Sequence, residues 1–313
     1  MNKVLGVKVY DPGFCTESYL DLMQDTGINT VFLGRSALSE TLCEELSQRG
    51  LFWNIVEPVF LITDDKTIIL ATTQDRNVAS DDWVRFACPT DKEHLSRVQT
   101  RIKDDIRKFN PPGVSFDFIR FFQFWEMTMP SADPKKLPRT CYCSRCQKEA
   151  AKFAGEKEWR KSLITETAKN LASLAKEEKP EVRIGIHAVP WTRSLFDGSR
   201  ESVIGQDFSA LAPLCDYLTP MAYHHMMHMD TSYIKALLSD MTDEGCKHIV
   251  MSIQSKEAYR TDAMDSEEYE KALKIALESD GVLIYKWEDL CADKKRLGMT
   301  KALFKGLQTV TSY

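Results

Sequence analysis

The sequence lacks the signatures of several protein classes. No stretch of its 313 residues approaches the ~18 consecutive apolar residues of a membrane-spanning helix, and no long run of lysine and arginine marks a nucleic-acid or anionic-membrane surface. Lys and Arg number 41 against 46 Asp and Glu, which leaves a net charge of −5. Neither a Gly-x-Gly-x-x-Gly turn nor a phosphate-binding P-loop is present. The charge balance and the lack of basic and long apolar runs disfavour nucleic-acid and membrane partners and favour a small molecule or a neutral polymer, and the missing glycine motifs argue against a doubly wound open sheet.

Cysteine is sparse as well, and its count is odd. The chain carries nine cysteines, whereas disulfide scaffolds are typical of short chains that lack a sufficient core. A chain of this length with 43% hydrophobic residues can build a core of its own. Some of the thiols therefore need an explanation other than disulfide bonding.

The N-terminal segment, residues 1–10, has the pattern of a β-strand and not of a secretory signal peptide. We therefore expect a cytoplasmic protein, and the alternative of a signal removed from a longer precursor stays open.

Short apolar segments alternate with longer amphipathic segments along the chain. Eight of the apolar segments are candidate strands, at residues 4–10, 30–34, 51–57, 113–119, 182–189, 217–223, 248–253 and 282–287. Helical spacing fills most of the intervals, at 17–26, 38–49, 94–109, 144–178, 233–244 and 266–278. Strands that alternate with helices pair in parallel through crossovers. The pattern predicts an α/β fold, a single (β/α)8 TIM barrel over residues 1–313, with a doubly wound open sheet as the rival.

Two connections are long enough to be insertions. Residues 58–90 follow the third predicted strand, and residues 120–146 follow the fourth. Because both follow a strand, both are expected at the C-terminal face of the barrel, where barrel enzymes place their chemistry.

The second insertion ends in a dense cysteine cluster, Cys141-Tyr142-Cys143-Ser144-Arg145-Cys146. Thiols this close do not easily satisfy disulfide geometry among themselves, but their sulfurs can converge on one tetrahedral ion. A closed structural site needs a fourth ligand, and Cys88 in the first insertion is the best candidate. The sequence therefore predicts a structural zinc bound by Cys88, Cys141, Cys143 and Cys146, which would join the two insertions.

Asp117 stands near the end of an otherwise apolar predicted strand. A carboxylate is costly to bury, so its presence there points to a functional or hydrogen-bonded role. Strand alternation places Ser115 and Asp117 on one side and Phe116 and Phe118 on the other. We therefore expect Asp117 to be a catalytic nucleophile or base at the barrel mouth.

Other predicted strand ends carry carboxylates, imidazoles and aromatic rings, a mixture that suits a carbohydrate. Aromatic faces can stack on sugar rings, and glycoside cleavage needs one carboxyl as nucleophile or base and another as acid. The candidate acids are Glu57, Glu126 and Glu288. The candidate substrate-binding residues are Tyr10, Arg120, Trp125, His187, Trp191, Tyr223, His224, Lys286 and Trp287.

Three alternatives stay open. A metal-dependent barrel hydrolase could bind its ion through Asp117 and three histidines, although the first strand lacks the His-x-His pair of barrel amidohydrolases; these histidines are His187, His224 and His225. A Schiff-base lyase could use Lys8 or Lys286. A barrel that binds a glycan without cleaving it is the third.

The segment around Asp117 resembles a known family. Residues 83–90, with Cys88-Pro89, precede a helix and then the run Gly113-Val114-Ser115-Phe116-Asp117-Phe118-Ile119-Arg120. This arrangement resembles the hypothetical glycoside hydrolase (GHL-type) family of TIM barrels. The segments Pro220-Met221-Ala222-Tyr223 and Lys286-Trp287 are similar to strands of the chitinase-like barrels. The resemblance implies a β/α barrel that acts on glycosides, with Asp117 as the catalytic carboxylate.

The cysteine cluster is similar to the zinc site of the trimeric β-galactosidase barrels, whose fourth cysteine comes from upstream as Cys88 would. This resemblance implies the metal and not the catalytic residues. Gln254 stands where those enzymes carry a glutamate at the end of the seventh strand, and Ile119 stands where chitinase-like enzymes carry one after the fourth.

Overall fold

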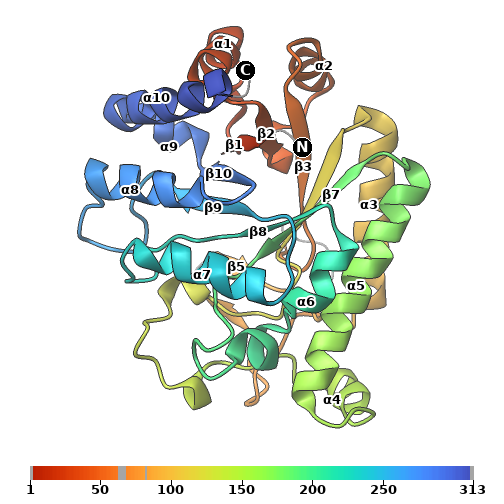
Figure 1. Ribbon diagram of the computed structural model, residues 1–313. Helices are drawn as coiled ribbons and strands as arrows, with labels where there is room; N and C mark the ends of the chain where they lie inside the picture. Colours follow the sequence, from red (N-terminus) through yellow and green to blue (C-terminus); the bar gives the residue numbers. More distant parts are fainter. Residues whose placement is uncertain (1–2, 63–67, 82, 311–313) are drawn as a thin grey trace.

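The computed structural model describes residues 3–62, 68–81 and 83–310, and it contains a nearly closed barrel of eight parallel strands (Figure 1). The strands lie in the order β8-β7-β6-β3-β2-β1-β10-β9, and parallel bridges from Leu218 to Ile249 and from Met221 to Ser252 link β8 to β9. Their bounds are β1 (Val4–Val9), β2 (Thr30–Leu33), β3 (Phe52–Pro58), β6 (Gly113–Asp117), β7 (Arg183–Ala188), β8 (Tyr217–Pro220), β9 (Val250–Gln254) and β10 (Gly281–Tyr285). The predicted (β/α)8 architecture is confirmed.

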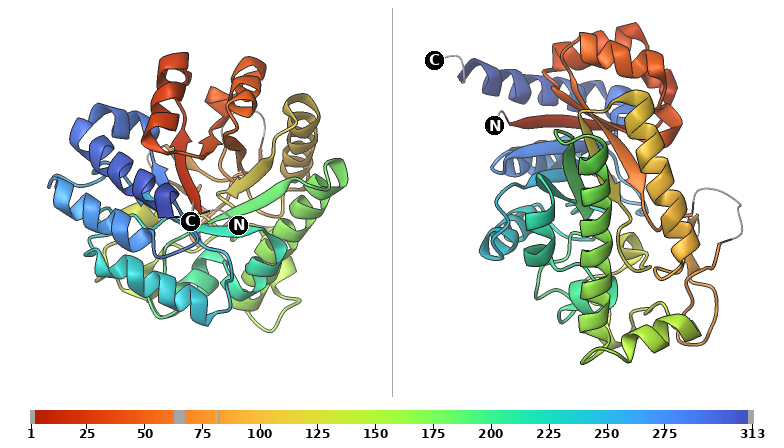
Figure 2. Two further views of the ribbon diagram at one scale, coloured as in Figure 1. Left: turned by 45° about the horizontal axis from the view of Figure 1, so that its top comes forward. Right: turned by 90° about the vertical axis from the view of Figure 1, so that its right-hand side faces the viewer.

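Helices surround the strands (Figure 2). The longer ones are α1 (Glu17–Thr26), α2 (Glu40–Gln48), α3 (Lys92–Phe109), α5 (Glu156–Glu178), α7 (Ser232–Asp243), α8 (Ser266–Ala276) and α10 (Lys294–Val310). Three short helices are α4 (Ser144–Ala150), α6 (Phe208–Leu211) and α9 (Trp287–Ala292). No helix in the described ranges is long and apolar enough to cross a bilayer.

Two predicted segments differ from the observed ones. The helical stretch 144–178 is two helices, α4 and α5, because residues 151–155 interrupt it. The last strand ends at Tyr285, and Trp287 opens α9 instead of closing the strand. Helices α6, α9 and α10 lie outside the predicted helical stretches.

Helix α3 illustrates how the sequence defines these elements. The Asp91 carboxylate caps its N-terminus by accepting a hydrogen bond from the Glu93 amide at 3.2 Å. Val98, Ile102 and Ile106 recur every fourth residue and are buried, so they present one apolar stripe to the barrel. The helix ends at Asn110, whose φ of 48° is left-handed.

Side chains of the strands pack in two separate layers. Those that point outward join the helices in the main core, whereas a smaller cluster fills the barrel interior; its buried members are Phe32, Val56, Tyr217, Val250 and Leu283. Gly185 makes room for this filling, since a Cβ there would lie 2.5 Å from the Tyr217 ring. The alternation between layers decides which strand residues reach the barrel mouth.

The connections after β3 and β6 contact each other. The first includes the antiparallel pair β4 (Ser80–Asp81) and β5 (Val84–Arg85); its residues 63–67 and 82, within the predicted insertion 58–90, lie outside the described residues. The Tyr142 amide of the second connection donates to the Thr72 carbonyl of the first at 3.0 Å. The two segments are therefore joined beside the cysteine cluster.

Candidate functional site

A cavity of about 740 Å³ opens at the carboxyl ends of the strands. Residues of four barrel strands, β1, β3, β6 and β10, and residues of the connections that follow strands of the barrel line it. The lining residues are Lys8, Tyr10, Gly34, Arg35, Ser36, Val56, Pro58, Leu61, Trp83, Asp117, Phe118, Glu126, Met221, Tyr223, Met226, Tyr259, Tyr285 and Lys286. Asp117 and Glu126 are the two carboxyl groups among them.

Asp117 is the last residue of β6 and is paired across the sheet with Pro58. Its Oδ2 accepts a hydrogen bond from Lys8 Nζ at 3.0 Å, and its Oδ1 accepts one from the Phe118 amide at 2.8 Å. Burial alone would raise the pKa of Asp117, but the charges of Lys8 and His187 outweigh it and hold this pKa at about 2. Asp117 is therefore a carboxylate at neutral pH.

The backbone turns sharply after Asp117. Phe118 has a φ of 52°, a left-handed conformation that is uncommon for a residue other than glycine. In this conformation the Phe118 amide donates a hydrogen bond to the Asp117 carboxylate, and Phe118 also lines the cavity. Such conformations cluster at functional sites.

Glu126 lies in a short helical turn, Trp125–Met127, of the connection after β6. Burial raises the pKa of Glu126 to about 7, although the nearby charge of Arg120 acts in the opposite direction. Near neutral pH this carboxyl group therefore holds its proton for much of the time. Asp117 and Glu126 line one cavity with opposite pKa shifts.

Aromatic rings form much of the cavity wall. The rings of Tyr223 and Tyr285 are stacked with centroids 5.2 Å apart, and Tyr10 meets Tyr285 edge-on at 6.1 Å. At the rim, Trp83 Nε1 donates to Tyr259 Oη at 2.8 Å, and Trp83 is 50% exposed. A partly open aromatic wall of this kind can stack on a flat apolar ring face.

The structure places the predicted substrate-binding residues at different depths. Tyr10, Tyr223 and Lys286 line the cavity. Arg120, Trp125 and His187 are buried and do not line it. Arg120 donates a hydrogen bond to the Gln123 carbonyl at 2.7 Å, and the ring centroid of Trp125 lies 5.9 Å from that of Tyr223. Burial lowers the pKa of His187 to about 3.

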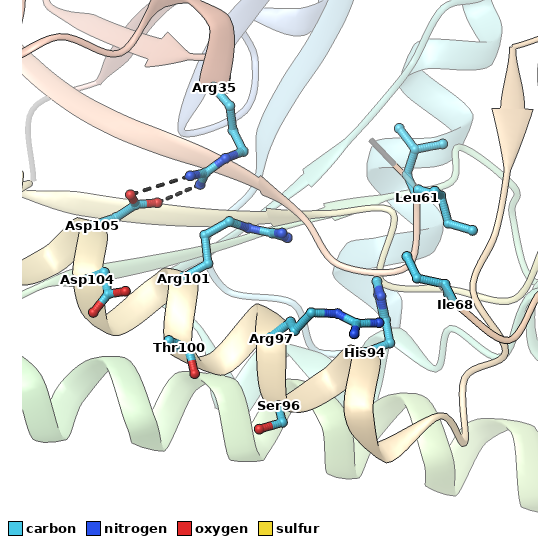
Figure 3. Close-up of a pocket in the computed structure, with 11 residues that line it drawn as sticks. Arg35, Leu61, Ile68, His94, Ser96, Arg97, Thr100, Arg101, Asp104 and Asp105 are labelled. Carbon is cyan, nitrogen blue, oxygen red and sulfur yellow. Dashed lines mark hydrogen bonds and ion pairs between the residues drawn. The ribbon is translucent and has the colours of Figure 1, made fainter. Parts of the chain in front are cut away.

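Glu57 does not reach the cavity, contrary to its expected place at the mouth. Its neighbour Val56 points inward, so Glu57 points to the outer face of β3. There Arg35 Nη1 donates to Oε2 at 2.9 Å, and Arg101 Nε donates to Oε1 at 2.8 Å. An adjoining outer cavity of about 460 Å³ lies along α3. Figure 3 shows residues that line it, with Arg35 reaching Asp105.

The expected place of Glu288 and Trp287 at the barrel mouth is also wrong, because both lie in α9, which turns them away from the cavity. Glu288 Oε1 accepts hydrogen bonds from the backbone amides of Tyr10 at 2.6 Å and Asp11 at 2.7 Å. Trp287 is fully buried in the main core, and its Nε1 donates to the Phe14 carbonyl at 3.2 Å. Both residues fix α9 to the connection after β1.

The expected place of Trp191 and His224 at the barrel mouth is also wrong, because both side chains are buried away from the cavity. Trp191 is fully buried, with its ring centroid 4.7 Å from that of Phe196. His224 Nε2 lies 2.9 Å from Glu268 Oε1 of α8. Neither residue lines the cavity, because neighbouring side chains already enclose both.

Sequence reasoning missed several cavity residues, notably Trp83, Tyr259 and Tyr285. Tyr285 could have been found, because it alternates with the interior residue Leu283 in the last strand. Trp83 and Tyr259 lie on connections, where no periodic pattern shows which way a side chain points.

The described residues do not assemble the catalytic metal site of the alternative hydrolase, which would combine Asp117 with His187, His224 and His225. In the part of the chain that the structure describes, two groups of side chains are close enough to hold an ion: the four predicted cysteines, and Glu201, Asp207 and Glu244. Neither group includes Asp117 or a histidine. The predicted Schiff-base candidate Lys8 has its Nζ bonded to Asp117.

The four predicted cysteines form one compact cluster, and all are free thiols. Cys88 Sγ lies 3.5 Å from that of Cys146, 3.6 Å from that of Cys143 and 3.8 Å from that of Cys141. Zn–S bonds of ~2.3 Å give a tetrahedron with edges of ~3.8 Å. The Thr72 amide points at Cys141 Sγ from 3.4 Å, an orientation that favours a thiolate. The donor set therefore fits a tetrahedral zinc ion.

Comparison with protein-family models and with curated proteins finds no match. Solved structures do match. A β-galactosidase from Halorubrum lacusprofundi superposes with a TM-score of 0.72 at 10% identity, covering 99% of this chain and 58% of that one. A GH42 β-galactosidase from G. stearothermophilus gives 0.70 at 13% identity, covering 100% and 57%.

A class V chitinase from Pseudomonas fluorescens gives a TM-score of 0.57 at 9% identity, covering 96% of this chain and 99% of that one. The present chain thus spans 56–60% of the β-galactosidase chains and nearly all of the chitinase. At these identities the similarity is one of fold, and it agrees with the barrel.

Proposed function

We propose that this protein is a glycoside hydrolase whose active site is the cavity at the barrel mouth. The observation that carries the proposal is the pair Asp117 and Glu126, which line one cavity with pKa values of about 2 and about 7. Glycoside cleavage uses one ionised and one protonated carboxyl group at the same pH. The matched structures named as β-galactosidases and as a chitinase support this reading.

In this mechanism Asp117 is the nucleophile or base and Glu126 is the general acid. Lys8 keeps Asp117 ionised and oriented through its 3.0 Å bond. Glu126 donates its proton to the departing glycosidic oxygen, and burial is what keeps that proton available near neutral pH. The choice among the three predicted acids is thereby narrowed to the one that lines the cavity.

The aromatic wall supplies the binding surface. The stacked pair Tyr223 and Tyr285 and the exposed rim residue Trp83 offer ring faces to the apolar C–H faces of sugars. The bound carbohydrate would lie between this wall and the two carboxyl groups.

We also propose that the cysteine cluster binds a structural zinc ion, which joins the connections after β3 and β6. The three Sγ–Sγ distances from Cys88, at 3.5–3.8 Å, and the gathering of all four sulfurs within 4.8 Å of one another match a tetrahedral thiolate site. Elemental analysis should find about one zinc per chain. The zinc content should fall in Cys143→Ser and stay constant in Cys291→Ser, a cysteine outside the cluster; zinc-free protein of native fold would refute the site.

The enzymatic proposal is tested with a panel of aryl glycosides of both anomers. Wild-type protein should release the aryl group from at least one of them, and Asp117→Asn should not. Glu57→Gln is the matched control, because it changes a buried carboxylate on the neighbouring strand that does not line the cavity. Sugar binding by calorimetry without any product would instead identify a glycan-binding barrel.

A further inference from the structure

The charged groups of the cavity indicate what kind of sugar it accepts. Five lining residues have ionisable acidic or basic side chains other than tyrosine: Lys8, Arg35, Asp117, Glu126 and Lys286. Four of them, all except Lys286, either form an ion pair within the protein or hold a proton that leaves them uncharged for much of the time. Lys8 is bonded to Asp117 at 3.0 Å.

The charge of Arg35 is compensated by two carboxylates that lie outside the cavity. Its guanidinium bonds Glu57 at 2.9 Å and Asp105 at 2.5 Å, both outside the cavity lining. Glu126 retains its proton for much of the time near neutral pH, because burial raises its pKa to about 7. Neither residue therefore leaves a strong uncompensated charge facing the cavity.

Lys286 differs from the other four. It follows β10, is half-buried, and its ammonium group forms no ion pair or hydrogen bond with any residue of the described ranges 3–62, 68–81 and 83–310. The neighbouring lining residues Tyr285 and Tyr223 are aromatic. A half-buried cation that lines the cavity loses hydration when a ligand fills it, and this loss is offset best by an anion of the ligand.

We infer that the cavity takes an acidic sugar, whose carboxylate or sulfate group pairs with the Lys286 ammonium while its ring stacks on the tyrosine wall. This inference rests on the proposed glycosidase function and specifies its substrate class. Asp117 does not oppose it, because Lys8 compensates the charge of that carboxylate.

The test compares sugars that differ only in the acidic group. Nitrophenyl glucuronides and galacturonides of both anomers are assayed beside the matching glucosides and galactosides and beside 6-sulfated glycosides. Wild-type kcat/KM should be higher for an acidic member than for its neutral partner. Preference for the uronide assigns the anion to a carboxylate, and preference for the sulfated sugar assigns it to a sulfate ester; both support the inference.

Variants then locate the recognition. Lys286→Met should lower kcat/KM for the acidic sugar about 10- to 100-fold, mostly through KM, as expected for a lost charged hydrogen bond. Lys286→Arg should restore most of it, and Lys256→Met, an exposed lysine outside the cavity lining, should change nothing. Equal losses for acidic and neutral sugars in Lys286→Met, or a wild-type preference for neutral sugars, would overturn the inference.

The inference and the proposed function can fail separately. Cleavage of neutral glycosides alone contradicts the inference and leaves the glycosidase function intact. If no glycoside is cleaved, the glycosidase function fails, and calorimetry with trigalacturonic acid against galactotriose decides the inference. Binding of the acid that Lys286→Met abolishes supports it, and no difference between the two sugars contradicts it.

Discussion

Asp117 and Glu57 are buried carboxylates at the ends of adjacent strands, yet they lie on opposite sides of the sheet. Asp117 is level with Pro58, so the preceding Glu57 is level with Phe116. Asp117 faces the cavity and bonds Lys8, whereas Glu57 faces the helices and bonds Arg35 and Arg101. One residue of register therefore separates a group that a ligand can reach from one that only holds the fold together.

The electrostatic environments of Asp117 and Glu57 also differ, because the pKa of the first is lowered and the pKa of the second is raised. Lys8 and His187 overcome burial and lower the pKa of Asp117, whereas burial outweighs Arg101 and Arg35 and raises the pKa of Glu57. A buried and charge-paired carboxylate is thus not by itself a functional signal. The direction of the side chain relative to the barrel decides its role.

The largest expected effect is that of Asp117→Asn. We expect kcat to fall by about 10⁴-fold, because the amide can act neither as nucleophile nor as base. Unfolding should also become easier, since Lys8 would keep a buried charge without its partner. The double variant with Lys8→Met should regain stability in urea titrations but no activity; turnover near the wild-type level in either variant would contradict the assigned role.

Glu126→Gln should lower kcat by roughly 10²- to 10⁴-fold, the range for loss of a general acid. The loss should be small for dinitrophenyl glycosides, whose leaving group needs no proton. In the wild type, kcat/KM should decrease as the pH rises through about 7, where Glu126 loses its proton. A pH profile that is unchanged in Glu126→Gln would show that another group is the acid.

The same two pKa shifts affect stability with opposite signs. The pKa of Glu126 rises from 4.5 to about 7, so its contribution is complete below pH 4.5 and is lost as the pH rises through 7. The pKa of Asp117 falls from 3.8 to about 2, so its contribution is present above pH 3.8 and is lost as the pH falls toward 2.

Glu57→Gln should lower stability, as Asp117→Asn does, but should leave kcat almost unchanged. The free energy of unfolding should fall by about 2–3 kcal/mol, below the ~3–5 kcal/mol for a fully buried pair because Arg35 and Arg101 are partly exposed. The kcat of the folded protein should stay within about twofold of the wild type. Denaturant titration and activity assays measure the two quantities, and a large loss of kcat without destabilisation would invalidate the inner and outer distinction.

Trp83→Ala should have the smallest effect. Loss of one partly exposed stacking face costs about 1 kcal/mol, which corresponds to a roughly fivefold higher KM with little change in kcat. Phe153→Ala, an exposed aromatic residue outside the cavity lining, is the control. An equal change in both variants would exclude a specific contact with Trp83.

The barrel could be predicted from sequence because each strand is a short buried run bounded by turns. The break between α4 and α5 was missed because Gly155 alone interrupts a stretch, 144–178, whose composition is otherwise helical. Strand alternation puts Asp117 on the same side as Ser115, and the cost of burying a carboxylate against the helices indicated that this polar side is the inner one. Glu57 could not be placed without the pairing of Pro58 with Asp117, since an isolated strand pattern does not show which face is inner.

The acid could not be chosen from sequence for a different reason. Glu126 lies on a connection, and its pKa is raised by burial, which outweighs the lowering effect of the Arg120 charge. Trp287 was misassigned because the chain leaves β10 two residues earlier than its apolar run suggests. Both outcomes depend on tertiary packing and not on local pattern.

The most direct test of the account is a carbon-13 NMR titration of the glutamate side-chain carboxyl groups between pH 4 and 9, in wild-type protein and in Glu126→Gln. We predict one carboxyl signal with a midpoint near pH 7 that is absent from the variant. If the signal removed by the substitution titrates instead near the ordinary glutamate value of 4.5, Glu126 is ionised at neutral pH and the proposed division of roles between the two carboxyl groups is wrong.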